Sequence, residues 1–127
     1  YLNAWKRFLV ESGFVIEEIE QRGFNERWGF AGCLDRRGRL NGMPTGLDLT
    51  CGACPAWVRM QLAAYIEFGK YPTTSGRMAV ELHGDGTYRS ITIPVRQHTQ
   101  DFNDFCCCLR VFTLKREFNQ QRERQAA

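Results

Sequence analysis

Residues 28–50 read WGFAGCLDRRGRLNGMPTGLDLT, and this stretch decides the fold class. Residues 28–36 have the composition of a β-strand, with glycines that indicate a bend or a close backbone approach. Asn41-Gly42 is a hairpin turn signal, and it leads into a further strand at Thr45–Thr50. The stretch therefore predicts two neighbouring strands of a β-sheet joined by a tight turn.

The sequence on either side of this hairpin predicts more strands and three helices. Apolar residues at helical spacing indicate helices over residues 1–12 and 101–118, and Pro55 opens a third helix. Strand-like runs occupy residues 14–22, 77–83 and 87–94. Together these elements predict an α+β fold, in which a mixed central sheet of about five strands is flanked by helices.

We expect a single domain over residues 1–127, ending in a tail at 119–127 that has no apolar periodicity and frays. The first helix begins without a cap or an initiator Met, which is typical of a chain that has lost an N-terminal segment. The apolar face of the last helix is expected to be buried against the sheet. That face consists of Phe102, Phe105, Leu109 and Phe112.

The composition excludes two classes of protein. With 43% apolar residues and nine Phe, the chain has ample material for a core and is not disordered as a whole. No run approaches the ~18 apolar residues of a membrane span, and there is no signal peptide. Cys106, Cys107 and Cys108 are adjacent and cannot all find disulfide partners, so the six cysteines predict mostly buried free thiols in a reducing cytoplasm.

The charge is mild, at +3, but it consists largely of arginine. Fourteen of the seventeen basic residues are Arg, whose rigid guanidinium fork suits bidentate contacts to phosphate. This bias favours a nucleic-acid partner. The alternative, a GC-rich genome that encodes arginine for other reasons, explains the bias equally well.

Two acidic residues stand out by their position. Asp35 lies at the end of one strand and Asp48 lies within the next, across the Asn41-Gly42 hairpin. Such pairing can bring two carboxylates within several ångströms, which suits a shared Mg²⁺ ion. Glu20, on the preceding strand, is the candidate for a third acid. The alternative is that all three are solvated acids at strand ends.

Three motifs in order resemble the PD-(D/E)XK nuclease superfamily, in its RecB/Cas4-like branch of phage and prophage exonuclease-like proteins. The motifs are GCLDR at 32–36, LDLTCG at 47–52 and QLAAY at 61–65. That branch pairs G-x-x-D-R with a strand reading D-x-K-T-G and a helix carrying Q-x-x-x-Y. The resemblance implies a restriction-endonuclease-like core that hydrolyses DNA with Mg²⁺ or Mn²⁺, in a bacterial cytoplasm and without a membrane.

The resemblance also implies roles for individual residues. Asp35 and Asp48 would be metal ligands, helped by the main-chain carbonyl of Leu49. Gln61 and Tyr65 would face the site from the helix and position the DNA strand or the metal shell. Without the resemblance, these two residues are equally well explained as helix surface and core edge.

Two arginines are candidates for contact with DNA. Arg36 would sit near a phosphate, although an ordinary surface charge is the simpler explanation. Arg59, in the helix after Asp48, could reach inwards towards the site.

The sequence departs from the family at two places. The lysine of D-x-K is Thr50 here, and a neutral hydroxyl cannot stabilise developing negative charge as an ammonium does. The upstream helix that often carries a histidine ligand is absent, while His83 and His98 lie far downstream and are expected at the surface. The chain is therefore either a weakened nuclease or a catalytically inactive relative that binds DNA or a protein partner.

Cys51 and Cys54 form a C-x-x-C pair, which with two further cysteines could hold zinc or an iron–sulfur cluster. A second C-x-x-C is missing, and the pair overlies the T-G of the nuclease motif. We expect ordinary packing here, with a small cysteine-based metal module as the weakest of three hypotheses.

Overall fold

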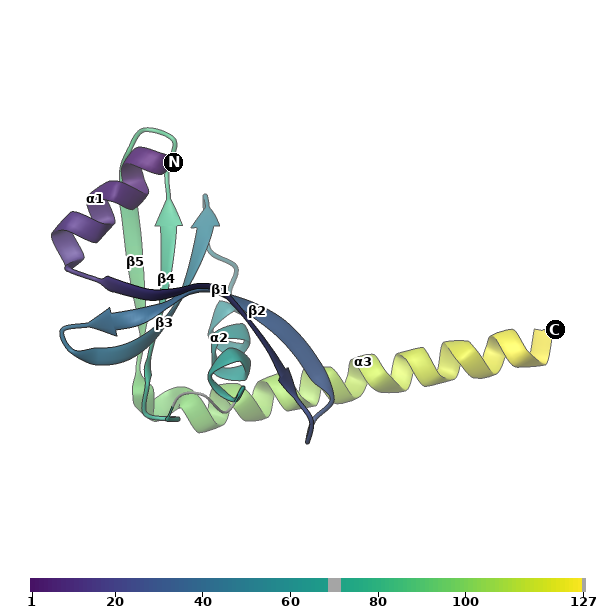
Figure 1. The fold of residues 1–127 in the computed structure, drawn as a ribbon. Helices are drawn as coiled ribbons and strands as arrows, with labels where there is room; N and C mark the ends of the chain where they lie inside the picture. Colours follow the sequence, from purple (N-terminus) through teal and green to yellow (C-terminus); the bar gives the residue numbers. More distant parts are fainter. Residues whose placement is uncertain (69–71, 127) are drawn as a thin grey trace.

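The computed structural model describes residues 1–68 and 72–126, and it shows an α+β fold built on a five-stranded sheet (Figure 1). The strands are β1 (Val15–Asn25), β2 (Phe30–Leu40), β3 (Met43–Cys51), β4 (Gly76–Leu82) and β5 (Tyr88–Ile93). They lie side by side in chain order, with β3 and β4 parallel and the other neighbours antiparallel. The predicted mixed sheet flanked by helices is therefore confirmed.

The helices join the sheet at both faces and at one end. They are α1 (Leu2–Ser12), α2 (Val58–Ile66), the 3₁₀ turn η1 (Val95–Gln97) and α3 (His98–Ala126). The crossover from β3 to β4 contains α2, as parallel neighbours require. Pro55 lies one turn before this helix rather than opening it, because its carbonyl accepts the N–H of Val58 in a preceding turn.

Strand β4 shows why the core has two sides. Its seven residues read GRMAVEL, and all except Gly76 are buried. Since successive side chains of a strand point to opposite faces, Met78, Val80 and Leu82 pack in one apolar cluster and Ala79 packs in another. The first cluster includes Phe8 of α1 and the second includes Leu62 of α2, so these two helices cover opposite faces of the sheet.

The hairpin between β2 and β3 forms where the sequence predicts it. Asn41 and Gly42 both have positive φ angles, of 52° and 78°, which is the conformation of a type I′ turn. Arg36 lies opposite Leu47 and Leu40 lies opposite Met43, so the two strands pair in an unbroken antiparallel register between these limits.

Helix α3 differs from the prediction. Residues 119–126 are helical rather than frayed, and the helix extends well beyond the sheet (Figure 1). Gln, Arg, Glu and Ala are good helix formers, so a segment without apolar periodicity can still be helical. Only the first part of α3 packs on the domain: Phe102, Phe105 and Leu109 are half-buried, and Phe112 is 61% exposed.

The cysteines are free, but the prediction that they are mostly buried is wrong. Cys33, Cys51, Cys107 and Cys108 are exposed, whereas Cys54 and Cys106 are half-buried. Consecutive residues of a helix point about 100° apart, so one-sided packing of α3 turns only Cys106 towards the domain. Within the described residues, no helix is long and apolar enough to cross a membrane.

Candidate functional site

Asp35 and Asp48 meet where β2 separates from β3. The regular pairing of the two strands stops at Arg36 and Leu47. Beyond this limit the main-chain N–H of Leu49 has no regular partner on β2. The Asp35 carboxylate accepts this N–H instead, at 2.8 Å. Asp35 and Asp48 are equally spaced from the Asn41-Gly42 turn, which accounts for their meeting.

The two carboxyl groups interact directly. Burial, a hydrogen bond to Asp35 and its charge together raise the pKa of Asp48 from 3.8 to about 8. Neither acid forms an ion pair with an Arg or Lys in the described part of the chain. The pair is thus a concentration of negative charge in a half-buried place, which a proton or a cation would stabilise.

Tyr65 of α2 lies against the same pair. Burial, followed by the charges of Asp48 and Asp35, raises the pKa of its phenol, so the hydroxyl stays protonated and can donate a hydrogen bond. The ring can approach because residue 32 is glycine: a Cβ there would lie 2.5 Å from a ring carbon of Tyr65. Gln61 is one helical turn earlier, half-buried on the same side of α2.

Thr50 is beside a carboxylate that the sequence analysis missed. It lies opposite Glu81 of β4 in register, and its hydroxyl is 3.9 Å from the sulfur of Cys54. Glu81 is buried, and it accepts the main-chain N–H of Cys54 at 2.9 Å. Burial raises the pKa of the Cys54 thiol, and the charges of Asp48 and Glu81 raise it further. The sequence did carry a signal for Glu81, because a single acidic residue within the otherwise apolar run MAVEL indicates a buried carboxylate.

Both arginines proposed for DNA contact have partners within the domain, and Arg36 donates to the main-chain carbonyl of Asp35 at 2.7 Å. Arg36 stacks over the Trp5 ring, with 5.7 Å between the guanidinium carbon and the ring centroid. Arg59 does not reach inwards to the acidic pair. Its guanidinium instead forms ion pairs with Asp101 and Asp104 of α3.

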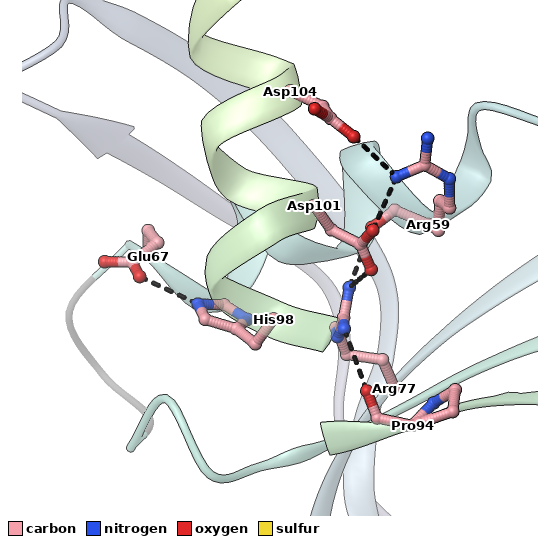
Figure 2. A network of polar contacts seen from close by, with 7 residues as sticks. All are labelled: Arg59, Glu67, Arg77, Pro94, His98, Asp101 and Asp104. Carbon is pink, nitrogen blue, oxygen red and sulfur yellow. Dashed lines mark hydrogen bonds and ion pairs between the residues drawn. The ribbon is translucent and has the colours of Figure 1, made fainter. Parts of the chain in front are cut away.

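Arg59 belongs to a buried polar network that the sequence analysis also missed (Figure 2). Asp101 bridges Arg59 and Arg77. The Arg77 side chain is fully buried, and its guanidinium nitrogen lies 2.8 Å from a carboxylate oxygen of Asp101. Arg77 also donates to the main-chain carbonyls of Arg59 and Pro94. This network fastens the start of α3 to β4 and α2.

His98 differs from the expectation that it lies at the surface. It is buried rather than at the surface, and its Nε2 lies 2.8 Å from a carboxylate oxygen of Glu67 (Figure 2). The first residue of α3 thereby contacts the residue that ends α2. The contact joins positions far apart in sequence, so no local pattern could reveal it.

Glu20 does not complete a cluster of three acids. It is exposed on the outermost strand, at a positive φ of 51°. Among residues 1–68 and 72–126, no group of three or more His, Cys, Asp or Glu side chains is arranged to hold a metal ion, and this includes Cys51 and Cys54. The structure thus offers a pair of carboxylates rather than a complete side-chain cage.

The pair nevertheless fits a hard cation. Its donors are oxygens, which Mg²⁺ prefers, and Mg²⁺ commonly uses only one or two carboxylates and keeps several waters. The N–H and C=O of one strand residue point to the same side, so the Leu49 carbonyl faces β2, as its N–H does towards Asp35. The donor set at hand is therefore two carboxylates and one main-chain oxygen.

No family model and no curated protein matches this chain. Among solved structures, the chain is similar to an alkaline exonuclease from Laribacter hongkongensis, with a TM-score of 0.49 and 13% sequence identity. The match covers 99% of this chain and 71% of the other. So few identical positions assign no residue role, and membership of the PD-(D/E)XK superfamily stays a prediction.

Proposed function

We propose that this domain is a metal-dependent DNA nuclease-like domain with weak phosphodiester hydrolase activity. The single observation that carries the proposal is the meeting of Asp35 and Asp48 at the separation of β2 from β3, beside Tyr65. The arrangement brings together one residue from each of the three nuclease-like motifs, namely Asp35, Asp48 and Tyr65. The arginine-rich composition is consistent with DNA as the substrate.

The proposed cation is Mg²⁺ or Mn²⁺, held by Asp35, Asp48 and the Leu49 carbonyl. When bound, it would acidify a water and stabilise charge on the phosphate. The Leu49 N–H holds Asp35 in place, so the acid keeps one orientation. Tyr65, as a neutral phenol, donates a hydrogen bond to the phosphate or to a water, and Gln61 can support it from the preceding turn.

Weak activity follows from Thr50. A preorganised charged group at this position is typically worth ~10²–10³ in rate, and threonine supplies none. Arg59 does not replace it, because its guanidinium is bound to two aspartates of α3. Glu81 adds negative charge beside Thr50, which opposes the approach of a phosphate.

Two measurements test the proposal. Titration with Mn²⁺, followed by calorimetry or by electron paramagnetic resonance, should show a site that is lost in Asp35→Asn and in Asp48→Asn. Cleavage of end-labelled DNA should be slow, should require the cation and should be lost in the same variants. Glu117→Gln removes an exposed carboxylate on α3 and serves as the matched control. Failure of the wild-type protein to bind Mn²⁺ would contradict the proposed metal dependence.

A second candidate is a catalytically inactive relative that binds DNA or a protein partner. The substitution at Thr50, together with the engagement of Arg59, favours it. The same experiment decides between the two: a site that binds Mn²⁺ without any cleavage of DNA supports the inactive relative.

A further inference from the structure

A cleft lies between the tip of the β1–β2 hairpin and α3, away from the acidic pair. Its volume is about 280 Å³, and it is lined by Arg27, Trp28, Cys106, Leu109, Arg110 and Thr113. The hairpin supplies the first two residues and α3 supplies the others. The cleft therefore depends on how the start of α3 is fastened to the domain.

The hairpin tip is held in one conformation by Asn25. The Asn25 side-chain oxygen accepts the N–H of Trp28 at 3.0 Å, and its main-chain oxygen accepts the N–H of Gly29 at 2.8 Å. The Asn25 amide donates to the carbonyl of Glu67 at the end of α2. A glycine suits position 29 because its φ is +69°. The loop that carries Trp28 is thus preorganised.

Trp28 is a large aromatic side chain left 44% exposed. Its ring forms a T-shaped pair with the Phe102 ring of α3, with 6.2 Å between the ring centroids. The Arg27 guanidinium carbon is 5.5 Å from the centroid of the same ring. A fixed, partly exposed aromatic ring flanked by an arginine is typical of surfaces on which nucleobases stack.

Two of the six residues that line the cleft are arginines, and none of the six is acidic. Arg27 and Arg110 are both exposed, and neither forms an ion pair within the part of the chain that the structure describes. Elsewhere on the domain, Arg7, Arg39 and Arg59 are each paired with an acid. The donors of Arg27 and Arg110 therefore remain available for phosphate oxygens.

We infer that this cleft binds single-stranded DNA, with one base stacked on Trp28 and phosphates contacted by Arg27 and Arg110. The inference rests on the proposed function for its choice of DNA. A single strand is favoured because a duplex keeps the faces of its internal bases stacked and leaves none for Trp28. From Phe30 to Asp35, β2 spans roughly 17 Å at about 3.3 Å per residue, so a strand of a few nucleotides could reach from the cleft to the acidic pair.

The test is DNA binding in EDTA, where no metal-dependent cleavage occurs. The anisotropy of a fluorescein-labelled oligodeoxythymidylate reports binding by the complete chain. Trp28→Ala should weaken binding at least about 5-fold, since stacking of one base is typically worth that much or more. Trp28→Phe should recover part of the loss. Trp57→Ala, which removes another exposed tryptophan, is the matched control and should bind like the wild type.

The arginines are tested through the salt dependence of binding. Each phosphate contact to a single strand contributes about 0.7 to the slope of log K against log salt concentration. Arg27→Gln combined with Arg110→Gln should therefore reduce that slope by about 1.4. The control is Arg89→Gln combined with Arg124→Gln, which removes the same charge from exposed positions on β5 and near the end of α3 and should change the slope less.

The outcomes separate this inference from the proposed function. Absence of binding by the wild type, equal binding by Trp28→Ala, or tighter binding of an RNA of the same length overturns the inference. If a folded Trp28→Ala variant binds and cleaves DNA normally, the inference fails while the nuclease proposal stands. If Trp28-dependent binding occurs and no divalent cation supports cleavage, the nuclease proposal fails and the inference stands.

Discussion

The two faces of the sheet differ sharply in chemistry. The face under α1 is an apolar core of Phe8, Leu47, Met78, Val80 and Leu82 with their neighbours. The face under α2 also has an apolar cluster, but β4 places Arg77 and Glu81 there. The acidic pair lies beside Tyr65 of the same helix. One face therefore stabilises the domain, and the other combines stability with buried charge.

This difference follows from alternation along a strand whose two faces are both covered. Successive residues of β4 point to opposite faces of the sheet. One continuous buried strand can therefore contribute Met78, Val80 and Leu82 to the apolar core and Arg77 to the polar network. Buried charges are costly unless they are paired, and Arg77 has Asp101. Substitutions on the α1 face should affect stability alone, whereas substitutions on the α2 face should also affect the site.

Phe8→Ala should have the largest effect on stability. Phe8 is buried, stacks on Trp5 and contacts Tyr88 edge-on. Its loss should lower the free energy of unfolding by about 3–5 kcal/mol, measured by urea denaturation. Val10→Ala, at an exposed position of the same helix, should change it by less than about 0.5 kcal/mol. An unchanged midpoint in Phe8→Ala would show that α1 is not docked.

Asp101→Asn should lower the free energy of unfolding by about 3 kcal/mol, because it leaves the buried Arg77 without a charged partner. Asp104→Asn is the control: its side chain is more exposed, and its partners Arg59 and Gln100 are not buried, so the change should be below about 1 kcal/mol. If both variants lowered the free energy of unfolding equally in urea denaturation, the buried Arg77–Asp101 pair would not be the stabilising contact of the network.

Stability in EDTA should fall as pH rises between about 4 and 8. The pKa of Asp48 is raised in the folded protein, so the folded state retains a proton that the unfolded state has lost across this window. The slope is at most that of one proton, about 1.4 kcal/mol per pH unit. Urea denaturation at several pH values should show this slope in the wild type and not in Asp48→Asn. The same slope in both would assign it to other groups.

Thr50→Lys should raise Mg²⁺-dependent cleavage of DNA by at least ~10-fold, which corresponds to about 1.4 kcal/mol. Because Glu81 could capture the new ammonium, the combination with Glu81→Gln should be at least as active. Asp48→Ala should abolish the gain. Robust wild-type activity would mean that another group replaces the lysine, and an inactive Thr50→Lys with bound metal would mean that some other feature of the site is missing.

Local patterns account for the side chains that the sequence predicted to lie close together and that do so in the structure. The Asn41-Gly42 turn fixes the register of β2 and β3 over a short loop, and this register brings Asp35 near Asp48. The i, i+4 spacing places Gln61 and Tyr65 on one side of α2. The contact of Tyr65 with Gly32 also agrees with the expected close backbone approach at this glycine.

Contacts between distant segments account for what the sequence analysis missed. Asp101 meets Arg77 across 24 positions and Arg59 across 42, and His98 meets Glu67 across 31. No periodicity relates such residues, since their pairing depends on where α3 docks. The exposure of Cys107, Cys108 and Phe112 on α3 has the same origin, because only the first part of this helix reaches the domain.

By itself, the sequence determined the strand pair, its turn and the meeting of two carboxylates, because a tight hairpin converts distance along the chain directly into distance in space. Tertiary structure alone decided what surrounds that pair. The α2 crossover placed β4 next to β3 and so put Glu81 beside Thr50, while the docking of α3 turned Arg59 away and formed the Trp28 cleft. These neighbours are set by packing of elements far apart in the chain, which no short motif specifies.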